Sequence, residues 1–197
     1  VVRMLAYSGI AQAGYILAPL AVAGATLGTG SEALRSIVVY LLIYAAMNLG
    51  AFAVVLAVAR KTRSGEIKSF GGLFSYAPTL TVCMTIFLFS LAGIPPAAGW
   101  FAKLSIFSSL ASAGTASGYV LAVIVGLNSV IAFGYYGRRI RVMWMDEAPD
   151  GDRTPIKVPA SLSFALIITV AVTLVWGVFP GALTHFTDHI TLFSLLR

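Results

Sequence analysis

The sequence has little charge, one cysteine and two histidines. Only 10% of its 197 residues are charged and 59% are hydrophobic, and the mean hydropathy is +0.93. Soluble domains carry about 25% charged residues, so this chain has too few polar groups to cover a surface in water. The single cysteine, Cys83, lies inside an apolar run, which excludes a disulfide framework and indicates a small buried apolar side chain.

Several functional classes have no sequence support. His185 and His189 are one helical turn apart but lack a clustered third ligand, so we expect no metal site. There is no phosphate loop, GxGxxG motif or haem-binding pattern. The net charge of +6 comes from residues between apolar runs, which argues against nucleic acid as a partner. The chain starts at Val1 without a signal-peptide pattern, and we expect it to be a piece of a longer protein, cut at its N-terminal side.

Long apolar runs dominate what is present. A helix needs about 20 apolar residues to cross a bilayer, and continuous runs argue against the alternation of a β-barrel. The sequence therefore predicts an all-α, polytopic transmembrane helix bundle with about five spans and lipid around it. The predicted spans are Met4–Leu27, Ser36–Ala59, Pro78–Leu110, Tyr119–Gly137 and Ala160–Phe179, joined by loops at Gly28–Arg35, Arg60–Phe70, Ala111–Gly118 and Arg138–Pro159.

The distribution of lysine and arginine predicts the orientation. Cytoplasmic loops carry an excess of these residues. Arg3 and the second and fourth predicted loops hold most of them, whereas the opposite side has only Arg35 and Arg197. We expect the basic loops to be cytoplasmic and the C-terminus to lie outside. The loop residues concerned are Arg60, Lys61, Arg63, Lys68, Arg138, Arg139, Arg141, Arg153 and Lys157; the fourth loop also holds Asp146, Glu147, Asp150 and Asp152.

Lys103 is the one charged residue inside an apolar run. A charge at membrane depth is costly and marks a functional site by default. The run around it is too long for one helix and is interrupted near its middle, because prolines supply no N–H and clash with the preceding turn. The predicted break residues are Gly93, Pro95, Pro96 and Gly99. A second half-helix starting near Ala97 would place Lys103 about two turns from its beginning.

A buried lysine suits proton transfer. Burial disfavours its charged form, so it can accept and release a proton, which an arginine cannot. A route also needs polar groups on neighbouring helices. Ser8, Gln12 and Tyr15 share one helical face, and Tyr40, Tyr44 and Asn48 follow each other at i+4 spacing. The predicted supporting residues are Tyr7, Ser8, Gln12, Tyr15, Tyr44, Asn48, Ser90, Asn128 and Tyr136. The alternative for each is that it only holds helices together.

Four segments resemble a known family. They are Arg3–Tyr15 (RMLAYSGIAQAGY), Tyr44–Phe52 (YAAMNLGAF), Phe89–Lys103 (FSLAGIPPAAGWFAK) and Leu127–Ile131 with Tyr135-Tyr136. Together they are similar to the antiporter-like membrane subunits of NADH–quinone oxidoreductase, respiratory complex I, and most of all to the subunit N group. Gln12 departs from the pattern, because many relatives have histidine there.

The resemblance implies a C-terminal portion of an inverted-repeat subunit. It implies that residues 1–145 belong to the second antiporter-like repeat, with four spans and the broken helix at 78–110. Residues 146–159 would form a cytoplasmic loop, and residues 160–197 the last transmembrane helix and an outer tail. Lys103 matches the lysine thought to exchange protons with the outer side of the bacterial inner membrane.

Cofactors and partners follow from the same resemblance. We expect no cofactor in this chain, since FMN, iron–sulfur clusters and quinone belong to partner subunits. The expected partners are other membrane subunits of complex I, including antiporter-like neighbours. Two alternatives stay open: a subunit of a multi-subunit Na⁺/H⁺ antiporter, or subunit L or M of the same complex. A third possibility is a passive scaffold in which Lys103 only bridges carbonyls released at the break.

Overall fold

The computed structural model describes residues 1–25, 28–63, 66–148, 151 and 153–187. Asp150, Asp152, His189 and Arg197 lie outside the described residues, as does the C-terminus. The only regular secondary structure in the described part is helical, and it has no strands. Its elements are α1 (Val2–Leu17), η1 (Ala18–Val22), α2 (Thr29–Thr62), η2 (Lys68–Phe70), α3 (Leu73–Tyr76), α4 (Pro78–Ala92), α5 (Gly99–Ser112), α6 (Ala116–Met145), α7 (Ala160–Val178) and α8 (Gly181–Thr187).

The prediction of an all-α membrane bundle is confirmed. Within the described residues, four helical segments are long and apolar enough to cross a membrane, namely Val2–Val22, Thr29–Thr62, Ala116–Met145 and Ala160–Val178. The remaining predicted span is two half-helices, α4 with 15 residues and α5 with 14. At 1.5 Å per residue each is roughly 22 Å long, too short for a hydrocarbon core of about 30 Å. Only together do α4 and α5 make one broken span.

Helix boundaries differ from the prediction at polar ends. The first helix ends at Leu17, where Pro19 turns the chain into the 3₁₀ segment η1, because proline cannot donate to the helical ladder. The predicted loop Gly28–Arg35 is wrong, since α2 already begins at Thr29. The predicted loop at Arg138 is also wrong, because α6 continues to Met145. Arginine is a good helix former, and hydropathy does not detect helical turns outside the apolar core.

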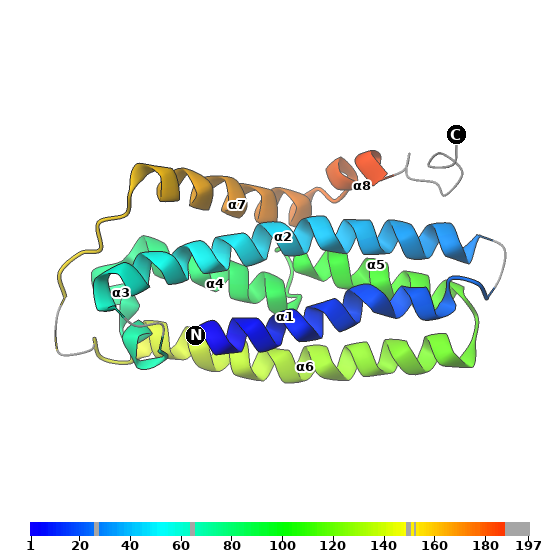
Figure 1. Ribbon diagram of the computed structural model, residues 1–197, viewed down its shortest axis with the longest axis horizontal. Coiled ribbons are helices and arrows are strands. Elements are labelled where there is room, and N and C mark those ends of the chain that lie inside the picture. The colour runs from blue at the N-terminus through cyan, green and yellow to red at the C-terminus, as the bar shows by residue number, and fades with distance from the viewer. Residues whose placement is uncertain (26–27, 64–65, 149–150, 152, 188–197) are drawn as a thin grey trace.

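The helices lie side by side around the broken span (Figure 1). In this view α7 lies above α2, while α1 and α6 lie below, and the half-helices α4 and α5 follow each other along the middle of the bundle. The largest fully buried side chains include Tyr40, Tyr136, Phe87 and Met47. Lipid is as apolar as these side chains, so close packing and internal hydrogen bonds hold such a bundle together.

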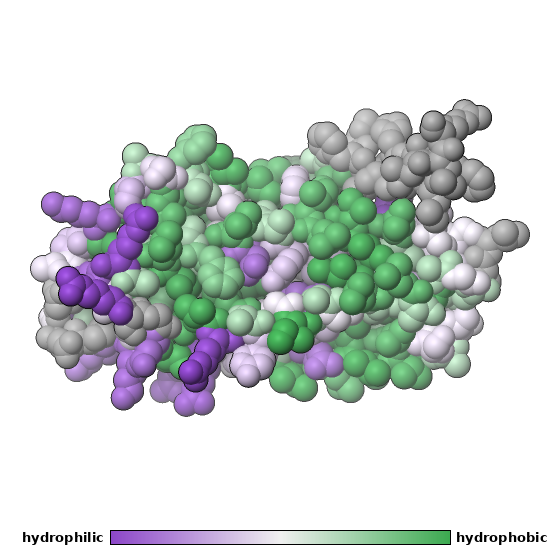
Figure 2. Space-filling model, in the orientation of Figure 1, coloured by the Kyte–Doolittle hydropathy of each residue, from purple (hydrophilic) through white to green (hydrophobic). Residues whose placement is uncertain are grey.

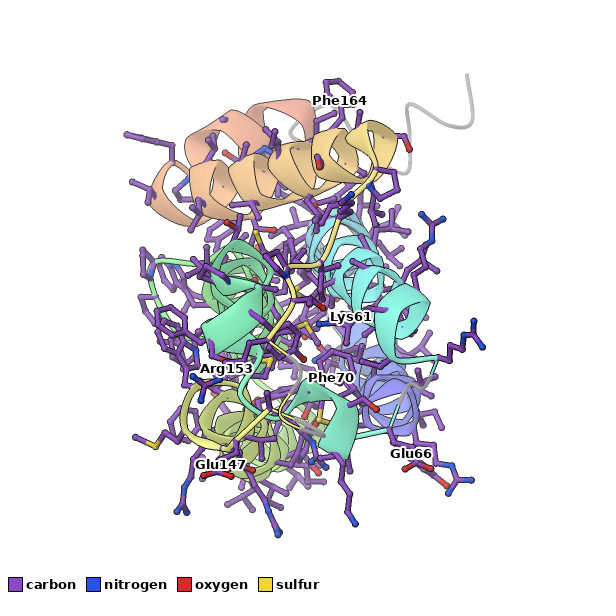
Figure 3. The ribbon with its side chains drawn as sticks, turned by 90° about the vertical axis from the view of Figure 1, so that its left-hand side faces the viewer. Lys61, Glu66, Phe70, Glu147, Arg153 and Phe164 are labelled. Atoms are coloured by element: carbon purple, nitrogen blue, oxygen red, sulfur yellow. The ribbon has the colours of Figure 1, made fainter. Side chains whose placement is uncertain are left out.

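Charged residues gather at one end of the bundle. Hydrophilic residues cover the end that carries α3, and a hydrophobic band follows it (Figure 2). Viewed onto that end, Lys61, Glu66, Glu147 and Arg153 come from α2, the following loop and the segment after α6 (Figure 3). Lys61 donates a hydrogen bond of 2.5 Å from Nζ to the Thr154 carbonyl. The basic loops therefore share one side of the membrane-spanning region.

Candidate functional site

The end of α4 is a helix terminus at membrane depth, where every carbonyl needs a partner. The last four carbonyls of a helix have no partner within it, and lipid supplies no donor. Gly93 adopts a left-handed conformation with φ of 89°. Its N–H donates to the Ser90 carbonyl at 2.9 Å, and the Ile94 N–H donates to the Phe89 carbonyl at 3.0 Å. This is a Schellman motif, and it satisfies two of the four carbonyls.

Side chains from two other helices satisfy the other two carbonyls. Gln12 of α1 donates from Nε2 to the Leu91 carbonyl at 3.4 Å. Lys103 of α5 donates from Nζ to the Ala92 carbonyl at 2.7 Å. The structure thus brings together two predicted site residues, on separate helices, at consecutive carbonyls of a third helix. The site is built on the break itself.

Lys103 is buried at this point, with 5% of its surface exposed. Its partners are a carbonyl at the negative end of a helix, which favours a cation, and the ring of Tyr15, whose centroid lies 5.5 Å from Nζ. A Cβ atom at Gly93 would lie 2.8 Å from Lys103 Cδ, so the glycine also makes room for the lysine. Because α5 begins at Gly99, Lys103 lies one turn into it, and the predicted start near Ala97 with a distance of two turns is wrong.

Ser90 ties the two half-helices together across the break. Its side chain is fully buried. Its Oγ accepts a hydrogen bond of 3.0 Å from the N–H of Gly99, which is the first residue of α5. A Cβ atom at Gly99 would collide with the Ser90 carbonyl. Two predicted residues, Ser90 and Gly99, therefore fix where α5 begins relative to the end of α4.

A buried polar network surrounds the broken span. The Ser8 hydroxyl of α1 is hydrogen-bonded to the Tyr136 hydroxyl of α6. The Tyr40 hydroxyl of α2 donates to Oε1 of Gln12, whose amide continues to the Leu91 carbonyl. Ser8, Gln12, Tyr40 and Tyr136 are each at most 3% exposed. These side chains connect α1, α2, α4 and α6 through hydrogen bonds at membrane depth.

Tyr40 is the residue that sequence reasoning left out of the predicted site. Its i+4 spacing from Tyr44 placed it on the right helical face, but Tyr44 and Asn48 are only half-buried, while Tyr40 is fully buried. The Tyr44 hydroxyl lies against α1, 3.1 Å from the position of a Cβ atom at Gly9. The spacing could have identified Tyr40, whereas the depth of each residue depends on how α2 is rotated in the bundle.

Two predicted residues lie outside the network. Tyr7 is 73% exposed, and Asn128 is exposed and donates from Nδ2 to the Ile124 carbonyl of its own helix at 2.9 Å. Both line a shallow cavity of about 270 Å³ between α1 and α6, together with Ser8 and Tyr15. The Tyr15 hydroxyl is buried without a hydrogen-bond partner among the described residues.

The arrangement can be compared with known proteins. Residues 1–132 match the family model described as NADH:quinone oxidoreductase/Mrp antiporter, transmembrane. The match covers more than half of the chain. The chain belongs to this family. It is a multi-pass membrane protein, and its broken span and buried lysine lie within the matched residues.

Curated relatives extend the likeness beyond the matched region. The chain is 43% identical over 178 residues to NADH-quinone oxidoreductase subunit N 2 of Sorangium cellulosum, covering 89% of this chain and 34% of that protein. It is 39% identical over 183 residues to subunit N of Heliobacterium modesticaldum, covering 93% and 36%. It is 41% identical to the chloroplastic NAD(P)H-quinone oxidoreductase subunit 2 of Mesostigma viride, covering 90% and 35%. The chain spans about a third of the length of these relatives.

Solved structures share the fold. One is an archaeal membrane-bound sulfane sulfur reductase complex, with a TM-score of 0.67 and 20% identity over 95% of this chain and 41% of that one. Another is respiratory complex I from Thermus thermophilus, with a TM-score of 0.59 and 22% identity over 89% of this chain and 44% of that one. At these identities the likeness concerns the fold alone. Both solved structures are of respiratory complexes.

Proposed function

We propose that this chain is part of a proton-translocating membrane subunit of NADH–quinone oxidoreductase. The buried amine of Lys103, held at the break of a membrane span, is the observation that carries this proposal. Protons would move through a hydrated path at mid-membrane centred on Lys103. Electron transfer among FMN, iron–sulfur clusters and quinone in other subunits would drive the movement. The names of the relatives in three organisms support this assignment.

Each part of the network has a distinct role in the proposal. Lys103 holds and releases the proton, since an amine can titrate where a guanidinium cannot. Gln12 keeps the Leu91 carbonyl satisfied, and the Ser8–Tyr136 pair supplies hydroxyls that can both donate and accept. Tyr7 and Asn128 would border the path where it reaches the cavity between α1 and α6. Waters in that cavity would complete the route.

The same proposal places the protein in its membrane. Relatives from bacteria are named as subunits of NADH-quinone oxidoreductase, and we assign this chain to a bacterial inner membrane. The basic end, with Lys61 and Arg153 (Figure 3), would face the cytoplasm by the positive-inside rule. Neighbouring antiporter-like subunits and lipids would cover the apolar faces.

A scaffold role for Lys103 is the second candidate, and one observation favours it. The Nζ–Ala92 bond of 2.7 Å satisfies a carbonyl that the helix break leaves open, which a structural residue would also do. An Na⁺/H⁺ antiporter is a further alternative, because the matching family includes the Mrp antiporters. Dependence of transport on Na⁺ instead of NADH would identify that activity.

The deciding experiment substitutes Lys103 in the full-length subunit. Lys103→Met removes the amine, and Lys103→Gln keeps an N–H donor for the Ala92 carbonyl but cannot carry the proton. If Lys103 is the carrier, NADH-driven proton uptake by membrane vesicles falls at least about tenfold in both variants, and NADH–quinone electron transfer falls with it. Assembly of the complex on native gels stays unchanged.

The control is Lys157→Met, because Lys157 is exposed in the loop before α7. It receives the same substitution and should keep wild-type uptake. If Lys103→Gln keeps wild-type proton uptake while Lys103→Met loses it, Lys103 has the scaffold role. Wild-type uptake in both Lys103 variants would overturn the proposed site.

A further inference from the structure

The break is held from a second side by α7. The first N–H groups of a helix have no partner within it, and α5 begins at membrane depth, where these donors need protein partners. The Gly99 N–H is bonded to Ser90. The preceding N–H, that of Ala98, donates to the Thr173 carbonyl of α7 at 2.9 Å. A hydrogen bond between backbone groups therefore joins the start of α5 to α7.

A tryptophan of α5 makes a second hydrogen bond to α7. Trp100, in the first turn of α5, donates from its indole Nε1 to the Gly177 carbonyl at 3.1 Å. Because α7 ends at Val178, the Gly177 carbonyl is one of the last four of its helix and has no helical donor. The beginning of α5 and the end of α7 thus satisfy each other's open backbone groups.

Gly177 also lies directly against the backbone of the break. A Cβ atom there would collide with the backbone of Pro96, Ala97 and Ala98. Gly177 and Thr173 are both buried, and they lie one turn apart on the same face of α7. The contact is therefore backbone against backbone, with no flexible side chain between that could absorb a displacement.

We propose that α7 is the positioning element for Lys103, acting through Gly177 and Trp100. Lys103 lies one turn after the residues that α7 holds, so α7 sets where its amine lies relative to the Ala92 carbonyl and the Tyr15 ring. Gly177 and Trp100 are positioning residues that act through α5 and do not touch the proton. The inference rests on the proposed function of Lys103.

Two variants in the full-length subunit test this. Trp100→Phe keeps an aromatic side chain and removes the N–H donor, and Gly177→Ala introduces the colliding Cβ. Trp100→Phe should lower NADH-driven proton uptake per assembled complex by roughly two- to tenfold, the equivalent of one lost neutral hydrogen bond. Gly177→Ala should lower it at least as far, because its Cβ displaces the start of α5. Each should also shift the pH profile of uptake, because the Lys103 amine then lies differently against the Tyr15 ring and the Ala92 carbonyl.

The matched control is Trp176→Phe, the same substitution within α7. The Trp176 ring is half-buried and neighbours Gly177, but its indole makes no hydrogen bond within the described residues. This variant should keep the wild-type rate and pH profile. A purely structural role of Trp100 and Gly177 would instead lower the amount of assembled complex and leave the rate per complex and the pH profile unchanged.

The Lys103 variants separate failure of this inference from failure of the proposed function. If Lys103→Met abolishes uptake while Trp100→Phe and Gly177→Ala behave as wild type, α7 does not position the lysine, and the inference is wrong. If Lys103→Met itself pumps normally, the proposed function fails, whatever the α7 variants do.

Discussion

The Gln12 side chain makes two hydrogen bonds to two different helices within the bundle. One end of its amide accepts from the Tyr40 hydroxyl, and the other donates to the Leu91 carbonyl. An amide is a neutral group that can both accept and donate in this way. A histidine at this position could do the same with its two ring nitrogens. The position therefore demands a bridging group more than a titratable one.

Replacing Gln12 by leucine should destabilise the subunit. Gln12→Leu leaves the buried Tyr40 hydroxyl and the Leu91 carbonyl without partners, and each unsatisfied buried group costs about 1–3 kcal/mol. We expect a lower temperature for irreversible loss of the folded subunit, measured on purified membranes. Gln12→His should retain most of the wild-type value.

Thr169→Val provides the comparison. The Thr169 hydroxyl bonds only to carbonyls of its own helix, Ala165 and Leu166, and these keep helical donors. Its loss should leave the transition temperature close to that of the wild type. An equal drop in Thr169→Val and Gln12→Leu would show that the bridging bonds of Gln12 contribute nothing specific.

Helices α2 and α4 meet where a glycine faces an aromatic ring. A Cβ atom at Gly50 would overlap the ring of Phe87, which is fully buried. Small residues at such positions let membrane helices approach closely. The broken span is therefore supported along its first half by a contact that tolerates no added volume.

Gly50→Ala should destabilise this contact by about 1–3 kcal/mol, the usual cost of overpacking. Gly126→Ala is the matched control, because its Cβ would lie 3.8 Å from the Phe107 ring, an ordinary contact distance. We expect Gly50→Ala to reduce the yield of folded subunit in detergent and to lower its transition temperature, and Gly126→Ala to preserve both. Equal behaviour of the two variants would show that the Phe87 ring moves aside and is not a rigid neighbour.

The local features of this broken span could be predicted from sequence, since their causes are local. Prolines and glycines at Pro95, Pro96, Gly93 and Gly99 interrupt a helix whatever surrounds them. The partners of the released groups could not be predicted, because they come from other helices. The bonds of Ala98 to Thr173 and of Trp100 to Gly177 join residues about 75 positions apart. Helical spacing gave the face that holds Ser8, Gln12 and Tyr15, but not the exposure of Tyr7 and Asn128.

For the protein as a whole, charge separates the two ends of the bundle. Arg60, Lys61 and Lys157 line one shallow cavity at the basic end, and Arg3, Lys68 and Arg139 line another. The far end carries Glu32 and Arg35. This asymmetry of charge sets the orientation of a membrane protein during insertion. The sequence predicts it, because the basic residues fall in alternate loops between the apolar runs.

Cysteine labelling in the full-length subunit, with its other cysteines removed, can test the proposed orientation. In a Cys83→Ala background, Lys157→Cys places a thiol in the exposed basic loop and Ser117→Cys places one at the exposed start of α6. A membrane-impermeant maleimide added to intact cells should label the Ser117 position and label the Lys157 position only after the membrane is opened. The reverse pattern would invert the assigned topology.

The bond between Lys103 and the Ala92 carbonyl has one more consequence. An ammonium group offers three N–H donors, and loss of one proton leaves two donors and a lone pair. The amine can therefore give up its proton and go on donating to the carbonyl at 2.7 Å. Release of the proton and the hydrogen bond to the Ala92 carbonyl are therefore separable at this residue, so the position of the side chain does not depend on its charge.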